Sequence, residues 1–161
     1  TKADLDWIGI QATRLNAELV RSIFGAMAHK KVIHDPDEPI DPEKRIIIGA
    51  GFQPGSSTDL RAVQLAERFR AGQVINMSNI DHVYSDDPKK NPDARKLNSI
   101  SWADFRKLVG DEWDPGLNTP FDPVASRAAQ AARLTVVIIG NDIENLKRLL
   151  KGESFRGTTI A

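Results

Sequence analysis

The sequence predicts an α/β fold in which a mostly parallel sheet is covered by helices on both sides. Short runs that are hydrophobic throughout alternate along the chain with segments of helical periodicity. Runs without polar alternation are typical of strands that are buried on both faces. Strand–helix alternation of this kind favours parallel strands joined by crossover helices. A chain of 161 residues can bury one sizeable core, so we expect a single domain over residues 1–161.

The first expected element is a helix over roughly residues 10–28, where Leu15, Leu19 and Ile23 recur at helical spacing. Residues 29–44 carry three prolines among acidic residues and predict an exposed loop. The remaining expected elements are, in chain order, a strand at Arg45–Gly49, a helix around Ala62–Phe69, a strand at Val74–Met77, a helix around Ala125–Ala132, a strand at Leu134–Ile139, a helix at Ile143–Leu150 and a weak final strand at Gly157–Ile160.

Composition excludes several classes of function. The 22 Lys and Arg residues balance the 22 Asp and Glu residues, which gives no global reason to bind nucleic acid or an anionic membrane. Cysteine is absent, and the three histidines are too few and too scattered for a zinc site. The longest apolar run, Leu134–Ile139, is far shorter than the roughly 20 residues that a membrane span needs. We expect a cytoplasmic domain with no signal peptide and no metal-ligating cluster.

The segment Gly49–Asp59 is the most informative for chemistry. A strand is expected to end at Gly49, and a helix is expected to begin near Ser57 or Thr58. Backbone amides at a helix start suit an anion such as a phosphate, and glycines let the backbone approach a ligand. Asp59, in the first helical turn, can orient a lysine or a metal. The alternative is a plain strand–helix connector with a Ser/Thr cap, since neither the P-loop nor the dinucleotide-binding spacing is present.

Two further segments carry polar groups. Residues 76–88 open at the carboxyl end of the second expected strand, where open parallel sheets usually bind ligands. There Asn79 and Asp81 offer polar groups and Tyr84 offers a flat face for a base, although an Asn- and Asp-rich turn is the simpler explanation.

The third segment is residues 6–17. A helix cap is a sufficient explanation for Asp6, and a solvated side chain is a sufficient explanation for Arg14, so periodicity alone requires no functional role.

Together these segments resemble the uridylate (UMP) kinase branch of the amino acid kinase superfamily, in its archaeal type. The resemblance rests on three motifs in the expected order: Ile8-Gly-Ile-x-Ala-Thr-Arg-Leu-Asn-Ala17, Gly49-x-Gly-x-x-Pro-Gly-x-Ser-Thr-Asp59 and Ser78-Asn-Ile-Asp-x-Val-Tyr-x-x-Asp-Pro88. Phe121–Ala125, which opens a helix, and the ending Lys151–Ile160 fit the same family. The resemblance covers nearly the whole chain and implies a three-layer α/β/α sandwich.

The resemblance also implies an activity and the residues that carry it. It implies phosphoryl transfer from Mg-ATP to UMP, giving UDP, by a homo-oligomer that is a hexamer in relatives. Asp59 is implied as the organising carboxylate near the transferred group. The residues implied to bind UMP are Asp6, Phe52, Gln53, Pro54, Gly55, Ser56, Ser57 and Thr58. Those implied to bind ATP are Ser78, Asn79, Tyr84 and Asp87.

The chain departs from the family pattern in two respects. The family begins with a strand and a Lys-x-Gly-Gly-Ser-type phosphate loop, which this sequence does not contain, so we expect the chain to lack the N-terminal part and to be inactive alone. His82 stands where the family has a glycine, and we expect its bulky polar ring to point outward into solvent. Two alternatives remain. One is a superfamily kinase for another acceptor, and the other is a non-catalytic storage or regulatory relative that binds nucleotides or oxyanions.

Overall fold

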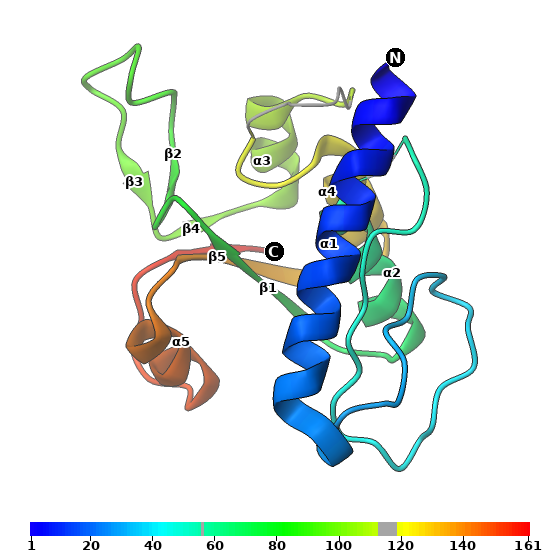
Figure 1. Ribbon diagram of the computed structural model, residues 1–161. Coiled ribbons are helices and arrows are strands. Elements are labelled where there is room, and N and C mark those ends of the chain that lie inside the picture. The colour runs from blue at the N-terminus through cyan, green and yellow to red at the C-terminus, as the bar shows by residue number, and fades with distance from the viewer. Residues whose placement is uncertain (56, 113–118) are drawn as a thin grey trace.

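The centre of the fold is a four-stranded sheet in the order β1-β5-β6-β4 (Figure 1). The computed structural model describes residues 1–55, 57–112 and 119–161. The strands of this sheet are β1 (Gln73–Ser78), β4 (Ser99–Ile100), β5 (Thr135–Gly140) and β6 (Thr158–Ile160). β1 pairs with β5 in parallel along its whole length, β4 is parallel to β6, and β6 runs antiparallel to β5. The predicted α/β fold with a mostly parallel sheet is thereby confirmed.

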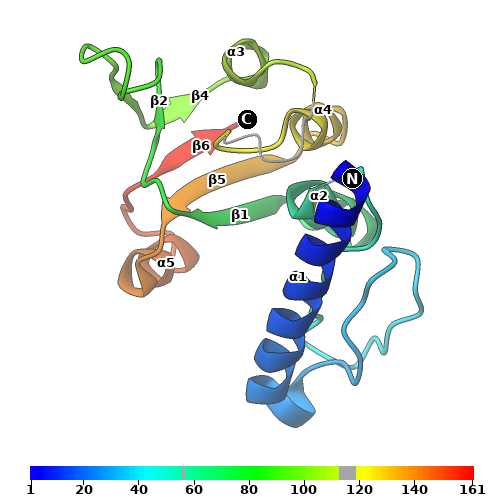
Figure 2. The ribbon, with the colours of Figure 1, turned by 45° about the horizontal axis from the view of Figure 1, so that its top comes forward.

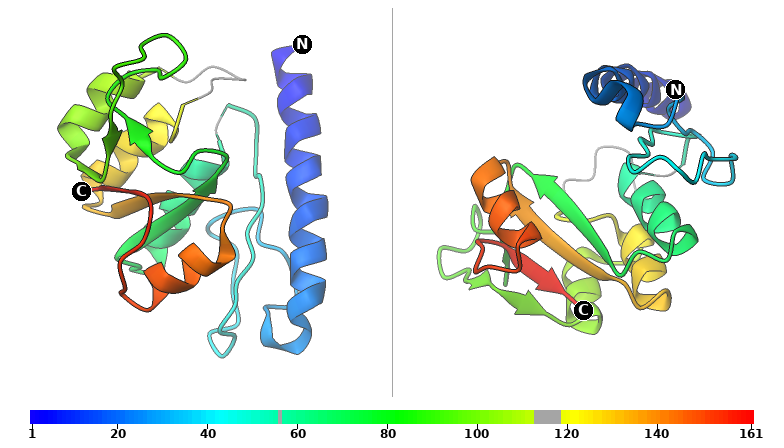
Figure 3. Two further views of the ribbon diagram at one scale, coloured as in Figure 1. Left: turned by 90° about the vertical axis from the view of Figure 1, so that its left-hand side faces the viewer. Right: turned by 90° about the horizontal axis from the view of Figure 1, so that it is seen from below.

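Helices cover both faces of this sheet. α2 (Thr58–Arg68), α3 (Trp102–Val109) and α4 (Pro123–Ala131) share one core with Val136 and Ile138 of β5. Successive side chains of a strand point to opposite faces, so the buried Val137 and Ile139 face the other side. That side carries α5 (Ile143–Leu150), which lies across the sheet from α2 (Figure 3).

The longest helix, α1 (Lys2–Phe24), stands outside this layered body, beside α2 and the segment that connects α1 to α2 (Figure 2). It begins earlier than predicted because Thr1 caps it and forms a capping box with Asp4. A short 3₁₀ turn, η1 (Gly25–Met27), ends it. Ala17 packs with Val32 and Ala50 of the connecting segment in a small second core. The large apolar residues exposed on α1 are Leu5, Trp7, Ile8, Leu15, Leu19, Val20 and Ile23.

The predicted strand at Arg45–Gly49 is wrong. The segment forms only isolated parallel bridges, from Ile46 to Ala28 and from Gly49 to Ile33, and does not join the sheet. Its apolar side chains are used instead against α1, as the packing of Ile48 in the second core indicates. Residues 29–44 form the expected irregular loop.

Four short elements, α3, β2 (Val83–Tyr84), β3 (Lys96–Leu97) and β4, have no counterpart in the sequence prediction. α3 follows β4, and β2 pairs with β3 as an antiparallel hairpin. The buried Trp102 and Phe105 of α3 meet edge to face, with ring centroids 6.1 Å apart, and the indole N–H of Trp102 donates to the Leu134 carbonyl at 2.9 Å. Within the described ranges, no helix has the length and apolar character that a membrane span requires.

Close packing at Gly157, just before β6, yields a stability prediction. A Cβ at this position would lie 2.5 Å from the Ile138 carbonyl oxygen and 2.8 Å from the Ile139 side chain. We expect Gly157→Ala to lower the free energy of unfolding by about 1–3 kcal/mol, because the backbone must shift to relieve the overlap. Gly72→Ala is the matched control, since nothing lies within 4 Å of its added Cβ. Urea denaturation measures both, and equal effects would contradict the packing described here.

Candidate functional site

The loop of residues 52–58 is held by α1. The hydroxyl of Thr13 accepts a hydrogen bond from the Gly51 amide at 3.0 Å, and a Cβ on Gly51 would lie 2.9 Å from that hydroxyl. The guanidinium of Arg14 donates to the carbonyl oxygens of Gly51 and Phe52, each at 3.0 Å. Arg14 is therefore a support of the loop, and its interpretation as a solvated side chain is wrong. Glycine at position 51 permits the close approach of loop and helix.

Asp6 joins the same loop from the first turns of α1. Its carboxylate accepts a hydrogen bond from the Gly55 amide at 3.0 Å, and its side chain is half-buried. The helix cap is Thr1, so the alternative interpretation of Asp6 as a cap is wrong. The structure thus places Asp6 in contact with the 52–58 loop, as is required if both belong to one binding site. Ser56 lies outside the described residues.

The loop ends at the start of α2, as the sequence predicts. The hydroxyl of Ser57, the N-cap, accepts a hydrogen bond from the Leu60 amide at 3.2 Å, and Thr58 and Asp59 are the first helical residues. A helix N-terminus presents free amides and a partial positive charge, which favour a bound phosphate. Phe52, at the other end of the loop, lies under the guanidinium of Arg61 at 5.0 Å, and both line a pocket of about 540 Å³ together with Gln53.

Asp59 makes the contact that links distant parts of the chain. Its carboxylate accepts a hydrogen bond at 3.0 Å from the amide of Asp122, which is 63 residues away. Burial raises the pKa of the Asp59 carboxyl above its ordinary value; the Asp122 amide lowers that pKa, and the nearby Asp122 carboxylate raises it. A half-buried carboxylate beside the buried one of Asp122 favours a cation between or near them.

Asp122 belongs to the candidate site, and sequence reasoning missed it. One carboxylate oxygen accepts a hydrogen bond from the Ala125 amide at 2.7 Å and caps α4. The other, Oδ2, is buried and has no hydrogen-bond partner among the described residues. The pattern Phe121–Ala125 predicts only the start of a helix. The approach of Asp122 to Asp59 in space is what places it in the candidate site.

The four residues predicted to bind ATP lie around one pocket. Ser78, Asn79, Tyr84 and Asp87 line a cavity of about 420 Å³ at the carboxyl end of β1 and along β2. Thr119 and Pro120 form another part of its wall, and the amide side chain of Asn76 donates to the Pro120 carbonyl at 3.3 Å. This pocket is called the β1–β2 pocket below.

Asp59 connects the 52–58 loop to the β1–β2 pocket. It follows the loop directly in sequence, and its partner Asp122 follows Thr119 and Pro120 of the pocket wall. The hydrogen bond between Asp59 and Asp122 therefore brings the end of the loop close to the segment that forms this part of the pocket wall. Among the described residues, no group of three or more His, Cys, Asp or Glu side chains could hold a metal ion by itself.

The expectation that His82 points into solvent is wrong. Its side chain is buried, with 7% of the residue exposed, and it lines the β1–β2 pocket. The physical reason is that the chain is tied to β6 at this point. The amide of the next residue, the buried Val83, donates to the hydroxyl of Thr158 at 2.8 Å, and His82, Val83 and Tyr84 all line the pocket.

Comparisons with known proteins show the family to which the chain belongs. The family model described as "Amino acid kinase family" matches residues 1–140. The uridylate kinase of Pyrobaculum arsenaticum is 36% identical over 152 residues, which are 92% of this chain and 70% of that protein. The uridylate kinase of Pyrococcus abyssi is 35% identical over 159 residues, which are 96% of this chain and 70% of that protein. The chain belongs to the amino acid kinase family.

Solved structures of the family extend the match to three dimensions. The uridylate kinase of Archaeoglobus fulgidus superimposes with a TM-score of 0.81 at 34% identity, covering 100% of this chain and 73% of that one. The UMP kinase of Bacillus anthracis has a TM-score of 0.78 at 20% identity, which supports the fold alone, and covers 99% of this chain and 69% of that one. The resemblance to archaeal uridylate kinases and the amino acid kinase fold are thereby confirmed.

The raised pKa of Asp59 predicts a pH-dependent gain in stability on neutralising it. A raised pKa means that folding favours the protonated Asp59 carboxyl. Above the raised pKa the carboxyl is ionised and lowers the stability of the folded state. Below the ordinary pKa of 3.8 it is protonated in both the folded and the unfolded state, and it then has no such effect. Without ligands, Asp59→Asn should therefore unfold at higher urea than the wild type at pH 7. The difference should shrink as the pH falls through the raised pKa and vanish below about pH 3.8.

The matched control is Asp104, an exposed carboxylate in the first turn of α3. A hydrogen bond from Lys107, with another from Ser101, lowers the pKa of Asp104, so Asp104→Asn should give no gain at neutral pH. A destabilised Asp59→Asn at pH 7, or a gain that does not depend on pH, would contradict the buried-charge account of Asp59.

Proposed function

We propose that the protein transfers the γ-phosphoryl group of ATP to UMP, giving ADP and UDP. The observation that carries the proposal is the hydrogen bond from the Asp122 amide to Asp59, which joins the 52–58 loop to the wall of the β1–β2 pocket. Two nucleotide sites that meet at one carboxylate suit a direct transfer between two bound nucleotides. The relatives named uridylate kinase support this choice of substrates.

UMP binds, on this proposal, at the 52–58 loop and Asp6. The loop amides and the N-terminus of α2 stabilise the negative charge of its phosphate. The carboxylate of Asp6 accepts hydrogen bonds from the ribose hydroxyls, a role for which a charged acceptor is well suited. Because Asp6 also holds the Gly55 amide, ribose and loop are positioned by the same side chain.

ATP binds, on this proposal, in the β1–β2 pocket. The ring of Tyr84 stacks against the adenine, and Asn79 and Asp87 bond to the base or the sugar. Their common position in one pocket supports this role, as does the hydroxyl of Ser78, which lies at the carboxyl end of β1 and donates to Asn79 at 3.3 Å. The pocket volume of about 420 Å³ lies within the range of small-molecule sites.

Phosphoryl transfer requires positioning and charge stabilisation more than covalent chemistry by the protein. Mg²⁺ prefers carboxylate and phosphate oxygens, and the unpartnered Oδ2 of Asp122 and the carboxylate of Asp59 fit an ion that is shared with the nucleotide phosphates. Bound there, the ion would neutralise charge that develops on the transferred group. The carboxylate of Asp59 would orient such an ion, its water ligands or a lysine.

We also propose that the protein acts in the cytoplasm as a homo-oligomer, with a hexamer expected from the family resemblance. The exposed apolar residues of α1 support self-association, because a contiguous apolar surface is typical of an interface. The family's lysine-bearing phosphate loop is expected for activity, so the experiments below use the complete gene product.

An assay of UDP formation tests the proposed function directly. The complete gene product, with Mg-ATP and UMP, should form UDP and ADP in equal amounts, as chromatography measures. Asp59→Ala should lower kcat at least about tenfold, about 1.4 kcal/mol of barrier, while the Kd values of both nucleotides change little. Asp104→Ala, which removes an aspartate from the first turn of α3, should leave kcat unchanged. Binding of nucleotides without UDP formation would instead favour a storage or regulatory role, and activity with another acceptor only would favour a different superfamily kinase.

A second prediction separates the two nucleotide sites. Asp6→Asn keeps an oxygen that can accept the Gly55 amide but removes the charge offered to the ribose. The KM for UMP should rise at least about tenfold, while the KM for ATP changes less than about twofold. Asp4→Asn, an exposed carboxylate one half-turn earlier on α1, is the control and should change neither. Equal rises in both KM values would show that Asp6 supports the fold of the site and not UMP.

A further inference from the structure

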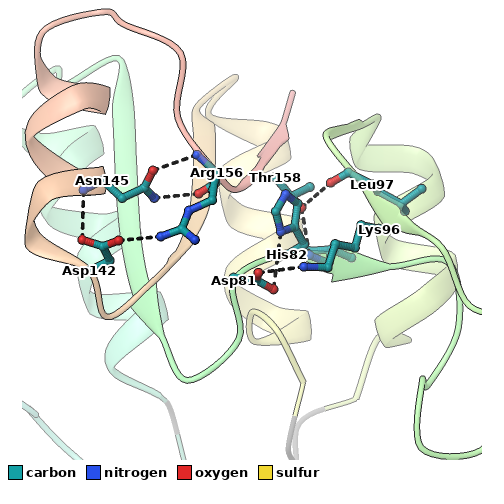
Figure 4. Close-up of polar contacts among 9 residues, drawn as sticks. Asp81, His82, Lys96, Leu97, Asp142, Asn145, Arg156 and Thr158 are labelled. Atoms are coloured by element: carbon teal, nitrogen blue, oxygen red, sulfur yellow. Dashed lines mark hydrogen bonds and ion pairs between the residues drawn. The ribbon is translucent and has the colours of Figure 1, made fainter.

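His82 occupies a fixed position in the wall of the β1–β2 pocket. The next residue, Val83, is buried, and its amide donates to the hydroxyl of Thr158, which in turn donates to the Leu97 carbonyl. These bonds tie the start of β2 to β6 and to β3 (Figure 4). With 7% of the residue exposed, the imidazole has little freedom to turn away from the pocket that it lines.

A carboxylate stands beside one nitrogen of this ring. Figure 4 shows Asp81 between His82 and Lys96. The Asp81 carboxylate is 3.4 Å from Nδ1 of His82 and accepts a hydrogen bond from the Lys96 ammonium at 2.8 Å. That hydrogen bond from Lys96 is the largest cause that lowers the pKa of Asp81, so the carboxylate is ionised at neutral pH. A negative charge facing Nδ1 favours the ring proton on that nitrogen.

The proton on Nδ1 decides what the ring offers to the pocket. In a neutral imidazole with Nδ1 protonated, Nε2 carries a lone pair and is a hydrogen-bond acceptor. Within the described part of the chain, Nδ1 is the ring nitrogen that is buried without a hydrogen bond, so the ring meets the pocket through its other edge. His82 therefore presents an acceptor, and a ligand there must offer a donor.

Tyr84 places a nucleotide base near this acceptor. His82 and Tyr84 are two residues apart, and both line the β1–β2 pocket. A base that packs on the Tyr84 ring therefore lies within reach of the other side chains of this pocket, His82 among them. Adenine carries an amino group, a donor, at position 6, whereas guanine and hypoxanthine carry a carbonyl oxygen, an acceptor.

We propose that His82 is a specificity-determining residue for the phosphoryl donor, and that its Nε2 accepts a hydrogen bond from the 6-amino group of adenine. This inference rests on the proposed function, since it places ATP in the β1–β2 pocket. A nucleotide with a 6-oxo group sets its oxygen against the Nε2 lone pair and leaves both acceptors without a donor. A polar group left unpaired in this way costs binding free energy, so the site discriminates against the 6-oxo nucleotide.

Inosine triphosphate tests the inference because it has nearly the size of ATP and carries the 6-oxo group in place of the amine. Calorimetric titration of the complete gene product should give a Kd for inosine triphosphate at least about tenfold above that for ATP. His82→Phe keeps a flat ring without an acceptor and should reduce this ratio to about threefold or less. His82→Gln, which can again offer an oxygen, should restore most of the preference, and His29→Phe, outside the pocket, should leave it unchanged.

Each outcome bears on one of the two proposals. A wild-type protein that binds both nucleotides equally well, or a His82→Phe variant that keeps the full preference, overturns the role of His82 and leaves the kinase function standing. A wild-type protein that binds neither nucleotide overturns the proposed function and this inference with it. The wild-type comparison needs no variant, so the inference stays testable even where a substitution at position 82 impairs folding.

Discussion

The hydrogen bond from the Asp122 amide to the Asp59 carboxylate is the constraint on which the site depends. It joins the start of α2, which follows the 52–58 loop, to the start of α4, which follows the wall of the β1–β2 pocket. The two helices also pack against one another on the same face of the sheet. Burial of two neighbouring carboxylates is unfavourable unless a cation or a hydrogen bond compensates. The negative charge of these two carboxylates is thus incompletely compensated at the place where two bound nucleotides would meet.

The two halves of the site are positioned by different means. α1 lies outside the layered body and fixes the 52–58 loop through polar contacts from Asp6, Thr13 and Arg14 to backbone groups. The β1–β2 pocket instead depends on the sheet itself, because β1 ends at Ser78 and the buried Val83 is tied to β6 through Thr158. The 52–58 loop is thus held by side chains of one helix, whereas the β1–β2 pocket is held by the sheet.

The sequence predicted the parts of the fold that have a periodic signal. β1 and β5 are continuous apolar runs, and α2, α4 and α5 have clear apolar faces, so their positions were correct. β2, β3 and β4 are two residues long each, too short for any periodicity to show. Arg45–Gly49 was wrong because an apolar run of that length does not reveal whether it joins a sheet or packs on a helix. Asp59 was found from its place after a glycine-bearing loop, whereas Asp122, 63 residues away, is recognised only in the folded chain.

A crystal structure of the complete gene product with a bisubstrate analogue, in which adenosine and uridine are joined through five phosphates, tests the central claim most directly. The account predicts adenosine against Tyr84 in the β1–β2 pocket and uridine at the 52–58 loop near Asp6. It further predicts that the phosphate chain passes the Asp59 and Asp122 carboxylates, with a cation between the phosphates and those groups. A phosphate chain that runs elsewhere, with Asp59 still bound only to the Asp122 amide, would contradict it.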